Sequence, residues 1–137
     1  MACLGVGAVS TFLQGCSSLK TLSGSITGDD LIINLKDFET NAANEIHYKK
    51  YIVVNNDTLK FPVCVYRHDA STYSALWMEC THQGAELQVF GDKLQCPAHG
   101  SEFNNKGEVI GSPANTNLRN FPTIIEGNLL KISLKKV

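Results

Sequence analysis

From Leu31 onward, short apolar runs alternate with clusters of turn-forming residues. The runs are "LIINL", "HYKKYIVV", "FPVCVYR", "YSALWMEC", "ELQVF", "GEVI", "FPTIIEG" and "NLLKISL". They are rich in Val, Ile, Tyr and Phe, which favour β-strands. Between them lie "NND", "HDAST", "GDK", "NNKG" and "EGN", which are typical of turns. The pattern predicts eight or more short strands, and therefore an all-β sandwich or small barrel.

Helical periodicity is almost missing from the chain. Apolar residues recur at a spacing of 3.6 only near Thr40 to Glu45, where we expect a single helical turn. The segment "SSLKTLSGSITGDD" is dense in Ser, Thr and Gly and poor in large side chains. Such a composition is typical of a flexible linker, so we predict a tether over residues 16–30.

The first sixteen residues, "MACLGVGAVSTFLQGC", are apolar and uncharged. They are too few to span a bilayer, and they resemble the apolar region of a secretory signal. "LQGC" resembles the lipobox of bacterial lipoproteins, in which the cysteine, here Cys16, is lipidated. We therefore expect a signal segment at 1–15, the tether at 16–30 and one domain at 31–137. An uncleaved anchor helix or a frayed terminus are the alternatives for the first segment.

The composition excludes some functions. At 137 residues the chain has room for one domain, and 43% hydrophobic residues suffice for a core. The net charge is −1 without a basic run, so we expect no nucleic acid partner. The five cysteines are too scattered for a disulfide framework.

Two short clusters, "CTHQGAEL" and "CPAHGSEF", pair a thiol with an imidazole. They contain Cys80 with His82 and Cys96 with His99, and thirteen residues separate His82 from Cys96. Two cysteines and two histidines can hold an iron–sulfur centre with two thiolates on one iron and two imidazoles on the other. The same donors can hold tetrahedral zinc. The glycines, proline and serine around the donors are not required by a zinc site.

With that framing the chain resembles Rieske-type [2Fe–2S] proteins, whose pattern is C-x-H-x-G followed by C-P-x-H-G-S-x-F. The matching positions are Cys80, His82, Gly84, Cys96, Pro97, His99, Gly100, Ser101 and Phe103. The resemblance covers residues 31–137. It implies an antiparallel Rieske-like β-sandwich with a small cluster-binding subdomain formed by two loops.

The resemblance also implies a role for each matched residue. Cys80 and Cys96 would bind the inner iron of a [2Fe–2S] cluster, and His82 and His99 the outer iron near solvent. Ser101 would donate a hydrogen bond to a bridging sulfide. The surrounding shell would further contain Gly84 and Gly100, which allow tight turns, and Pro113, from a loop that covers the cluster.

Two alanines distinguish this chain from quinol-oxidising members of the family. Ala85 and Ala98 stand where those members carry two cysteines that join the loops by a disulfide. The departure argues against a conventional cytochrome bc subunit. Histidine ligation implies a reduction potential of about −150 to +300 mV, against about −400 mV for all-cysteine clusters.

We therefore expect one-electron transfer by an exported carrier, lipid-anchored to a bacterial membrane in the cell envelope, with redox proteins as partners. The alternative is a cytoplasmic ferredoxin, or a small subunit of a quinol oxidoreductase, a ring-hydroxylating dioxygenase or a nitrite-reductase-like system. A zinc-stabilised binding module is the second alternative. No 2-His-1-carboxylate set follows the motifs, so we expect a redox component rather than a catalyst by itself.

Four other residues are expected to have ordinary roles. Cys64 is interpreted as a small buried hydrophobe. His47 and His68 are expected at the surface, and Trp77 in core packing.

Overall fold

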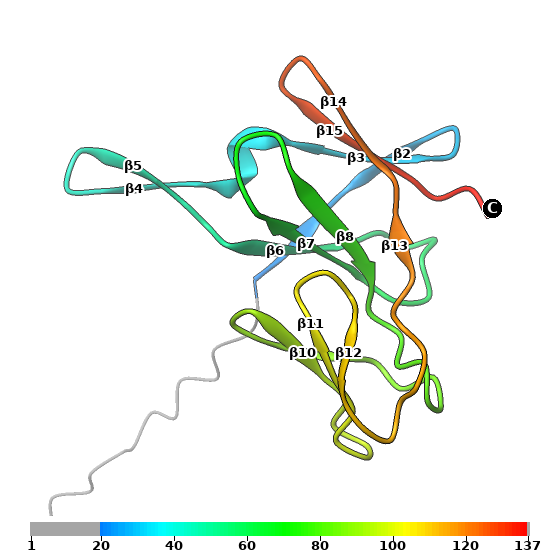
Figure 1. Cartoon of the computed structure of the whole chain (residues 1–137). Coiled ribbons are helices and arrows are strands. Elements are labelled where there is room, and N and C mark those ends of the chain that lie inside the picture. Colours follow the sequence, from blue (N-terminus) through cyan, green and yellow to red (C-terminus); the bar gives the residue numbers. More distant parts are fainter. Residues whose placement is uncertain (1–19, 137) are drawn as a thin grey trace, which may run out of the picture.

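A computed structural model describes residues 20–136 of the chain (Figure 1). The predicted signal segment and Cys16 lie outside this range. The described chain is built of strands with one 3-10 turn, so the all-β prediction is confirmed. The elements are β1 (Thr21–Ser23), β2 (Ser25–Thr27), β3 (Asp30–Asn34), η1 (Leu35–Phe38), β4 (Glu39–Ala42), β5 (Glu45–Tyr48), β6 (Tyr51–Asn55), β7 (Val63–Arg67), β8 (Tyr73–Trp77), β9 (Gln88–Phe90), β10 (Lys93–Gln95), β11 (Glu102–Asn104), β12 (Val109–Gly111), β13 (Asn120–Phe121), β14 (Thr123–Glu126) and β15 (Leu129–Ser133). No helix within residues 20–136 is long and apolar enough to cross a membrane.

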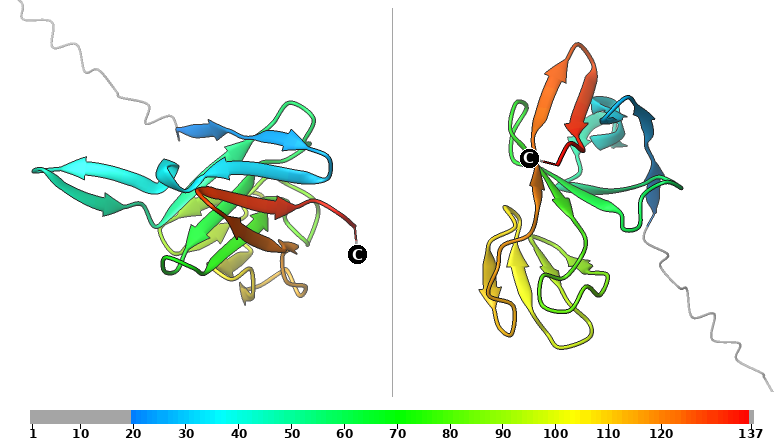
Figure 2. Two further views of the ribbon diagram at one scale, coloured as in Figure 1. Left: turned by 90° about the horizontal axis from the view of Figure 1, so that it is seen from above. Right: turned by 90° about the vertical axis from the view of Figure 1, so that its right-hand side faces the viewer.

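The strands form a sandwich with a smaller lobe beside it. One sheet has the order β1-β6-β7-β8-β13, and a second has the order β14-β15-β3-β2. The lobe is a third sheet, β12-β11-β10-β9, drawn in yellow below the sandwich in Figure 1. Strands β4 and β5 form a hairpin that projects to one side, as the view from above in Figure 2 shows. The sandwich with a separate small subdomain confirms the expected architecture.

The five-stranded sheet is covered on both faces. Along β6, Ile52 and Val54 join the core toward β3 and β15, whereas Val53 joins the core toward the lobe. On β7, Val63 and Val65 alternate in the same way with Cys64 and Tyr66. Because successive side chains point to opposite faces, a strand buried on both sides is apolar throughout. This explains the unbroken runs "YIVV" and "VCVY".

The structure corrects two predictions. Within the predicted tether, residues 21–23 pair in parallel with β6 and residues 25–27 pair with β3. The described chain is therefore folded from β1 onward, and the domain begins before residue 31. The helical turn expected near Thr40 to Glu45 is instead the tip of the β4–β5 hairpin, where Ala43 and Asn44 have positive φ angles of 52° and 62°.

Candidate metal centre

The four predicted ligands lie at one end of the lobe. The first ligand loop, residues 80–85, follows β8 and leads toward β9. The second ligand loop, residues 96–101, joins β10 to β11. Residues 112–119, here called the cover loop, connect β12 to β13. These three loops occupy the lower end of the molecule in Figure 1.

Both ligand loops have the same backbone hydrogen bonds. The Cys80 N–H donates to the Ala85 carbonyl at 2.8 Å, and the Gly84 N–H donates to the Cys80 carbonyl at 2.8 Å. In the second loop, the Cys96 N–H donates to the Ser101 carbonyl and the Gly100 N–H to the Cys96 carbonyl. Each loop is thus a closed turn of six residues that begins at its cysteine.

The fifth residue of each turn has a backbone conformation that strongly favours glycine. Gly84 and Gly100 have φ angles of +75° and +81°, which a residue with a Cβ adopts only at a cost. At Gly84 a Cβ would also lie 3.3 Å from Oε1 of Glu79. The spacing of cysteine and glycine in both motifs therefore reflects one repeated backbone turn.

Burial separates the thiols from the imidazoles. Cys80 and Cys96 are each only 2% exposed and belong to the core between the lobe and the five-stranded sheet. His82 and His99 are exposed. Their rings lie 5.1 Å apart, centroid to centroid, at an angle of 88°. The four side chains therefore form an inner thiol pair and an outer imidazole pair.

The cover loop is hydrogen-bonded to both ligand loops. Thr81 Oγ1 donates to the Thr116 carbonyl at 2.6 Å. In the second loop, Ser101 Oγ accepts from the Ala114 N–H at 3.0 Å, and Ser101 is fully buried. The described cysteines Cys64, Cys80 and Cys96 are all free thiols. Hydrogen bonds through the cover loop thus connect two loops that no disulfide joins within residues 20–136.

The donor arrangement fits a two-iron centre. A tetrahedral zinc site places four ligand atoms within about 2.0–2.3 Å of a single ion. A mixed [2Fe–2S] cluster instead takes two thiolates on one iron and two imidazoles on the other, which matches the inner and outer pairs.

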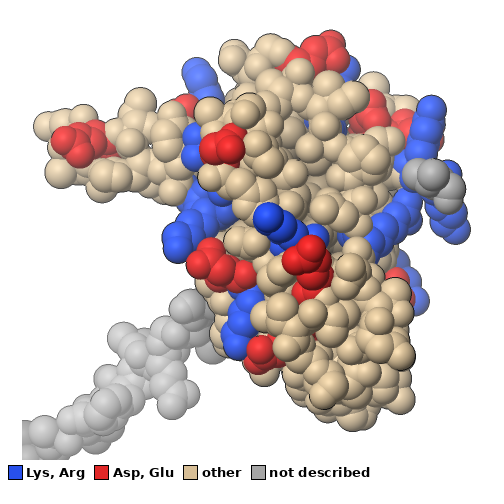
Figure 3. All heavy atoms as spheres, viewed as in Figure 1, with Lys and Arg blue, Asp and Glu red and all other residues tan. Residues whose placement is uncertain are grey.

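The end of the lobe is poor in charged side chains, and Arg119, the last residue of the cover loop, is the one charged residue of the three loops. The segments "CTHQGA", "CPAHGS" and "GSPANTNL" of the three loops contain no Lys, Arg, Asp or Glu. Figure 3 shows this region as an uncoloured area at the lower right, whereas the sandwich is studded with both charges. A partner that approaches the histidines from this side meets a largely uncharged surface, with Glu79 and Arg119 beside His82.

A cavity of about 540 Å³ opens beside the first ligand loop, between Glu79, His82 and Arg119. Glu79 is half-buried at its edge, and its Oε2 accepts from the Trp77 indole N–H at 2.8 Å. Trp77 itself packs edge-on against Phe61 and Phe121, with ring centroids 5.7 and 5.9 Å away. The hydrogen bond between Trp77 and Glu79 therefore holds the short segment that leads from the end of β8 to Cys80.

The remaining predicted residues have mixed outcomes. Pro113 is exposed in the cover loop and follows a cis peptide bond. Cys64 is fully buried, as expected, and burial raises the pKa of its thiol well above the ordinary 9.0. His47 is exposed, but His68 is half-buried, with Nε2 2.7 Å from Ser74 Oγ. Sequence reasoning missed Thr81 as a contact between loops, since its partner is a distant backbone carbonyl.

Known proteins resemble this chain over somewhat more than half of its length. The oxygenase component of dicamba O-demethylase from Stenotrophomonas maltophilia is 32% identical over 84 residues. The match covers 54% of this chain, and the chain spans only 25% of that protein's length.

Two solved structures are similar in fold. The cyanobacterial plasma membrane Rieske protein PetC3 from Synechocystis PCC 6803 is 31% identical, with a TM-score of 0.53 over 61% of this chain and 86% of its own. A chain from the complex of reduced oxygenase and oxidized ferredoxin in carbazole 1,9a-dioxygenase is 27% identical. Its TM-score is 0.50, over 64% of this chain and 83% of its own.

The family model for the Rieske [2Fe–2S] domain matches residues 38–122, which contain both ligand loops, the cover loop and the five-stranded sheet from β6 to β13. The [2Fe–2S] cofactor of this domain family explains why two buried thiols and two exposed imidazoles lie at the same end of the lobe. This chain belongs to the Rieske [2Fe–2S] family, whose domain binds a [2Fe–2S] cluster and transfers electrons.

Proposed function

We propose that Cys80 and Cys96 bind one iron of the cluster and that His82 and His99 bind the other. The observation that carries this assignment is the burial difference between the two pairs, with thiols 2% exposed and imidazoles open to solvent. A [2Fe–2S] cluster with these ligands supplies one-electron redox chemistry. Electrons would then enter and leave on the histidine side, where a partner can come close.

The residues around the ligands support this direction of transfer. Buried thiolates are costly without a cation, so the two cysteines favour metal binding at the base of the loops. The imidazoles at the end are neutral as ligands. The two ligand loops contain no charged side chain, and the oppositely charged Glu79 and Arg119 line the cavity beside His82. A partner would therefore dock through polar and van der Waals contacts, with little electrostatic steering.

Iron and sulfide analysis together with EPR spectroscopy tests the ligand assignment. The full chain should contain two irons and two acid-labile sulfides, and its dithionite-reduced form should give a rhombic signal of the mixed Cys/His type. His82→Ala and His99→Ala should each abolish that signal, whereas His47→Ala, at an exposed histidine on β5, should retain it. Stoichiometric zinc without sulfide in the native protein would overturn the assignment and favour a zinc-stabilised module.

For the location we propose attachment to the exported side of a bacterial membrane through lipidated Cys16, with redox proteins as electron donor and acceptor. The "LQGC" sequence supports the proposal, and so does the similarity to a cyanobacterial plasma membrane Rieske protein. Mass spectrometry of the membrane fraction from the native host should find acyl chains on Cys16 and no residue before it. Recovery of an unmodified Cys16 peptide from the soluble fraction would contradict this location.

A ferredoxin-like component of an oxygenase system is the second candidate. It is supported by the similarity to an oxygenase component and to a chain from an oxygenase–ferredoxin complex. In that case the partner would be an oxygenase, and the protein would be found in the cytoplasm with Cys16 unmodified. The mass-spectrometric measurement above distinguishes the two candidates directly.

A further inference from the structure

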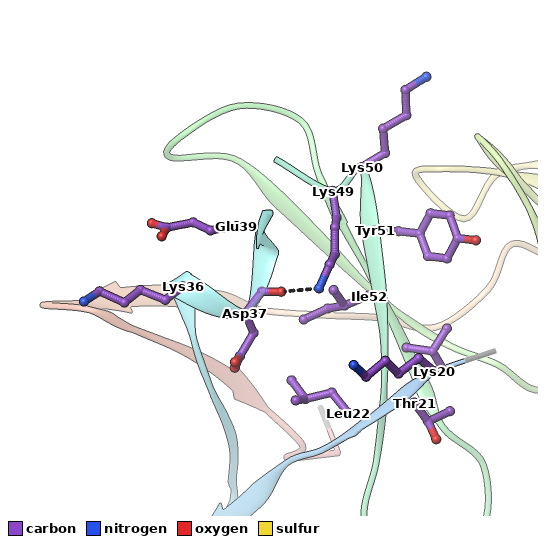
Figure 4. A pocket seen from close by; sticks show the side chains of 11 residues that line it. Lys20, Thr21, Leu22, Lys36, Asp37, Glu39, Lys49, Lys50, Tyr51 and Ile52 are labelled. Carbon is purple, nitrogen blue, oxygen red and sulfur yellow. Dashed lines mark hydrogen bonds between the residues drawn. The ribbon is translucent and has the colours of Figure 1, made fainter. Parts of the chain in front are cut away.

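A second cavity, of about 740 Å³, lies in the sandwich and contains none of the proposed ligands. It is lined by residues of the segments 20–22, 36–39 and 49–53, so β1, η1 and the start of β6 enclose it. Figure 4 shows its side chains from close by. It is larger than the cavity beside the ligand loops, and nothing in the redox function accounts for it.

Lysine side chains dominate the wall of this cavity. Four lysines line it, at positions 20, 36, 49 and 50, against two carboxylates, so the formal charge is +2. In Figure 4, Lys20 and Lys49 point toward the space between η1 and β6, whereas Lys36 and Lys50 extend outward. The cavity thus has two inward ammonium groups and two further ones at its rim.

The two carboxylates do not neutralise these lysines. The Asp37 carboxylate accepts the Asn34 N–H at 3.0 Å as part of the cap of η1, and Lys49 Nζ donates to the Asp37 backbone carbonyl instead. Among residues 20–136, the only ion pair within 4.0 Å that involves one of the four lysines joins Lys50 to Asp92, outside the cavity. The cavity is therefore available to an anion.

The floor of the cavity is apolar. Leu22 and Ile52 contribute aliphatic side chains, and in Figure 4 Ile52 lies beside the end of Lys49 and Leu22 beside the end of Lys20. A small hydrophilic anion would leave this surface uncovered. A ligand with an anionic group and an adjoining apolar part matches both the wall and the floor.

The position of the cavity in the chain indicates where such a ligand would come from. Lys20, one of the two inward lysines, follows Cys16 by four residues, which span at most about 14 Å when fully extended. If Cys16 is anchored in a bilayer, as proposed above, the rim is held within reach of the phospholipid headgroups. We propose that this cavity binds the headgroup of an anionic phospholipid, with Lys20 and Lys49 contacting the phosphate and Leu22 and Ile52 the adjoining carbon chain.

Vesicle binding by the cluster-loaded full chain with Cys16→Ser tests the proposal without the lipid anchor. The protein should cosediment with vesicles of phosphatidylcholine mixed with phosphatidylglycerol, but not with phosphatidylcholine alone. Lys20→Gln/Lys49→Gln should weaken this binding about 30-fold, or about fivefold per lysine. Lys60→Gln/Lys106→Gln, with the same change of net charge on other surfaces, should weaken it far less.

Three outcomes would overturn the inference. Equal binding to both kinds of vesicle would exclude recognition of an anion. Equal losses in the two double variants would mean that only net charge matters. Binding of inorganic phosphate in solution that Lys20→Gln/Lys49→Gln weakens, without cosedimentation with the phosphatidylglycerol vesicles, would indicate a site for free phosphate instead. Because the EPR signal reports the cluster independently, a failure here is distinguishable from a failure of the proposed electron-transfer site.

Discussion

Replacement of Ser101 by alanine separates the electronic role of this residue from its structural one. Ser101 is fully buried, and its Oγ accepts the Ala114 N–H at 3.0 Å. Within the described residues its own hydroxyl hydrogen bonds to no protein acceptor. Because buried donors are rarely left unpaired, a cluster sulfur is the partner that we expect for this hydrogen.

Two magnitudes follow from this geometry. Loss of the acceptor leaves the buried Ala114 N–H unpaired, which should cost about 1–3 kcal/mol of unfolding free energy. A hydrogen bond to a charged group contributes about 1.5–3 kcal/mol, and the Ser101 hydroxyl should favour the reduced state, in which sulfur is more negative. We take about 1 kcal/mol as the difference in this hydrogen-bond energy between the reduced and the oxidised state. Ser101→Ala should then lower the reduction potential by about 40 mV, since 59 mV corresponds to a tenfold change in the equilibrium constant for one electron.

Protein-film voltammetry and denaturant unfolding measure the two effects. Ser74→Ala is the matched control, because Ser74 is also a buried serine, bonded at 2.7 Å to His68 in the sandwich. It should lose stability and keep its potential. An unchanged potential in Ser101→Ala would refute the hydrogen bond to sulfur, and an equal shift in Ser74→Ala would show that the change is not specific to the site.

Three further predictions concern the core. Leu94→Ala, at a fully buried position on the strand before Cys96, should lower the unfolding free energy by about 2–5 kcal/mol and reduce iron content. Gly107→Ala should destabilise more than Gly127→Ala in thermal unfolding: both φ angles are positive, but only at Gly107 would a Cβ meet Leu76, at 2.9 Å. Burial raises the pKa of the Cys64 thiol, so folded protein should not react with a thiol reagent there, and fast labelling would contradict the packing. The Cys64 thiol stays protonated to higher pH in the folded protein than in the unfolded one. Its contribution to the free energy of unfolding should therefore be intact below pH 9.0 and should fall as the pH rises above 9.0.

The sequence predicted those parts of the fold whose signal is local. Strands buried on both faces are continuous apolar runs, and β6 and β7 were recognisable for that reason. The ligand motifs were equally readable, because cysteine, histidine and glycine lie within one six-residue turn. The metal-ligating side chains and the glycine that the turn favours all lie within these six residues.

Other parts depend on distant partners and gave no local signal. β1 contains two polar residues around Leu22, and only its pairing with β6, 32 residues later, makes it a strand. The β4–β5 hairpin is almost fully exposed, so no apolar alternation marked it. The bond between Ser101 and Ala114 depends on the path of the cover loop, which the order of residues does not reveal.

The chain passes from the sandwich into the lobe after β8 and returns to the sandwich at β13. β8 and β13 are hydrogen-bonded neighbours, with Leu76 opposite Asn120, so residues 78–119 form an insertion between two adjacent strands. Such a unit can unfold locally while the core between the two larger sheets stays intact. We expect the cluster-free protein to populate this opened state, in which Cys80 and Cys96 become accessible for cluster assembly. The same opening would uncover the lobe-facing side of the five-stranded sheet, so slow cluster delivery should appear as aggregation or proteolysis of the lobe.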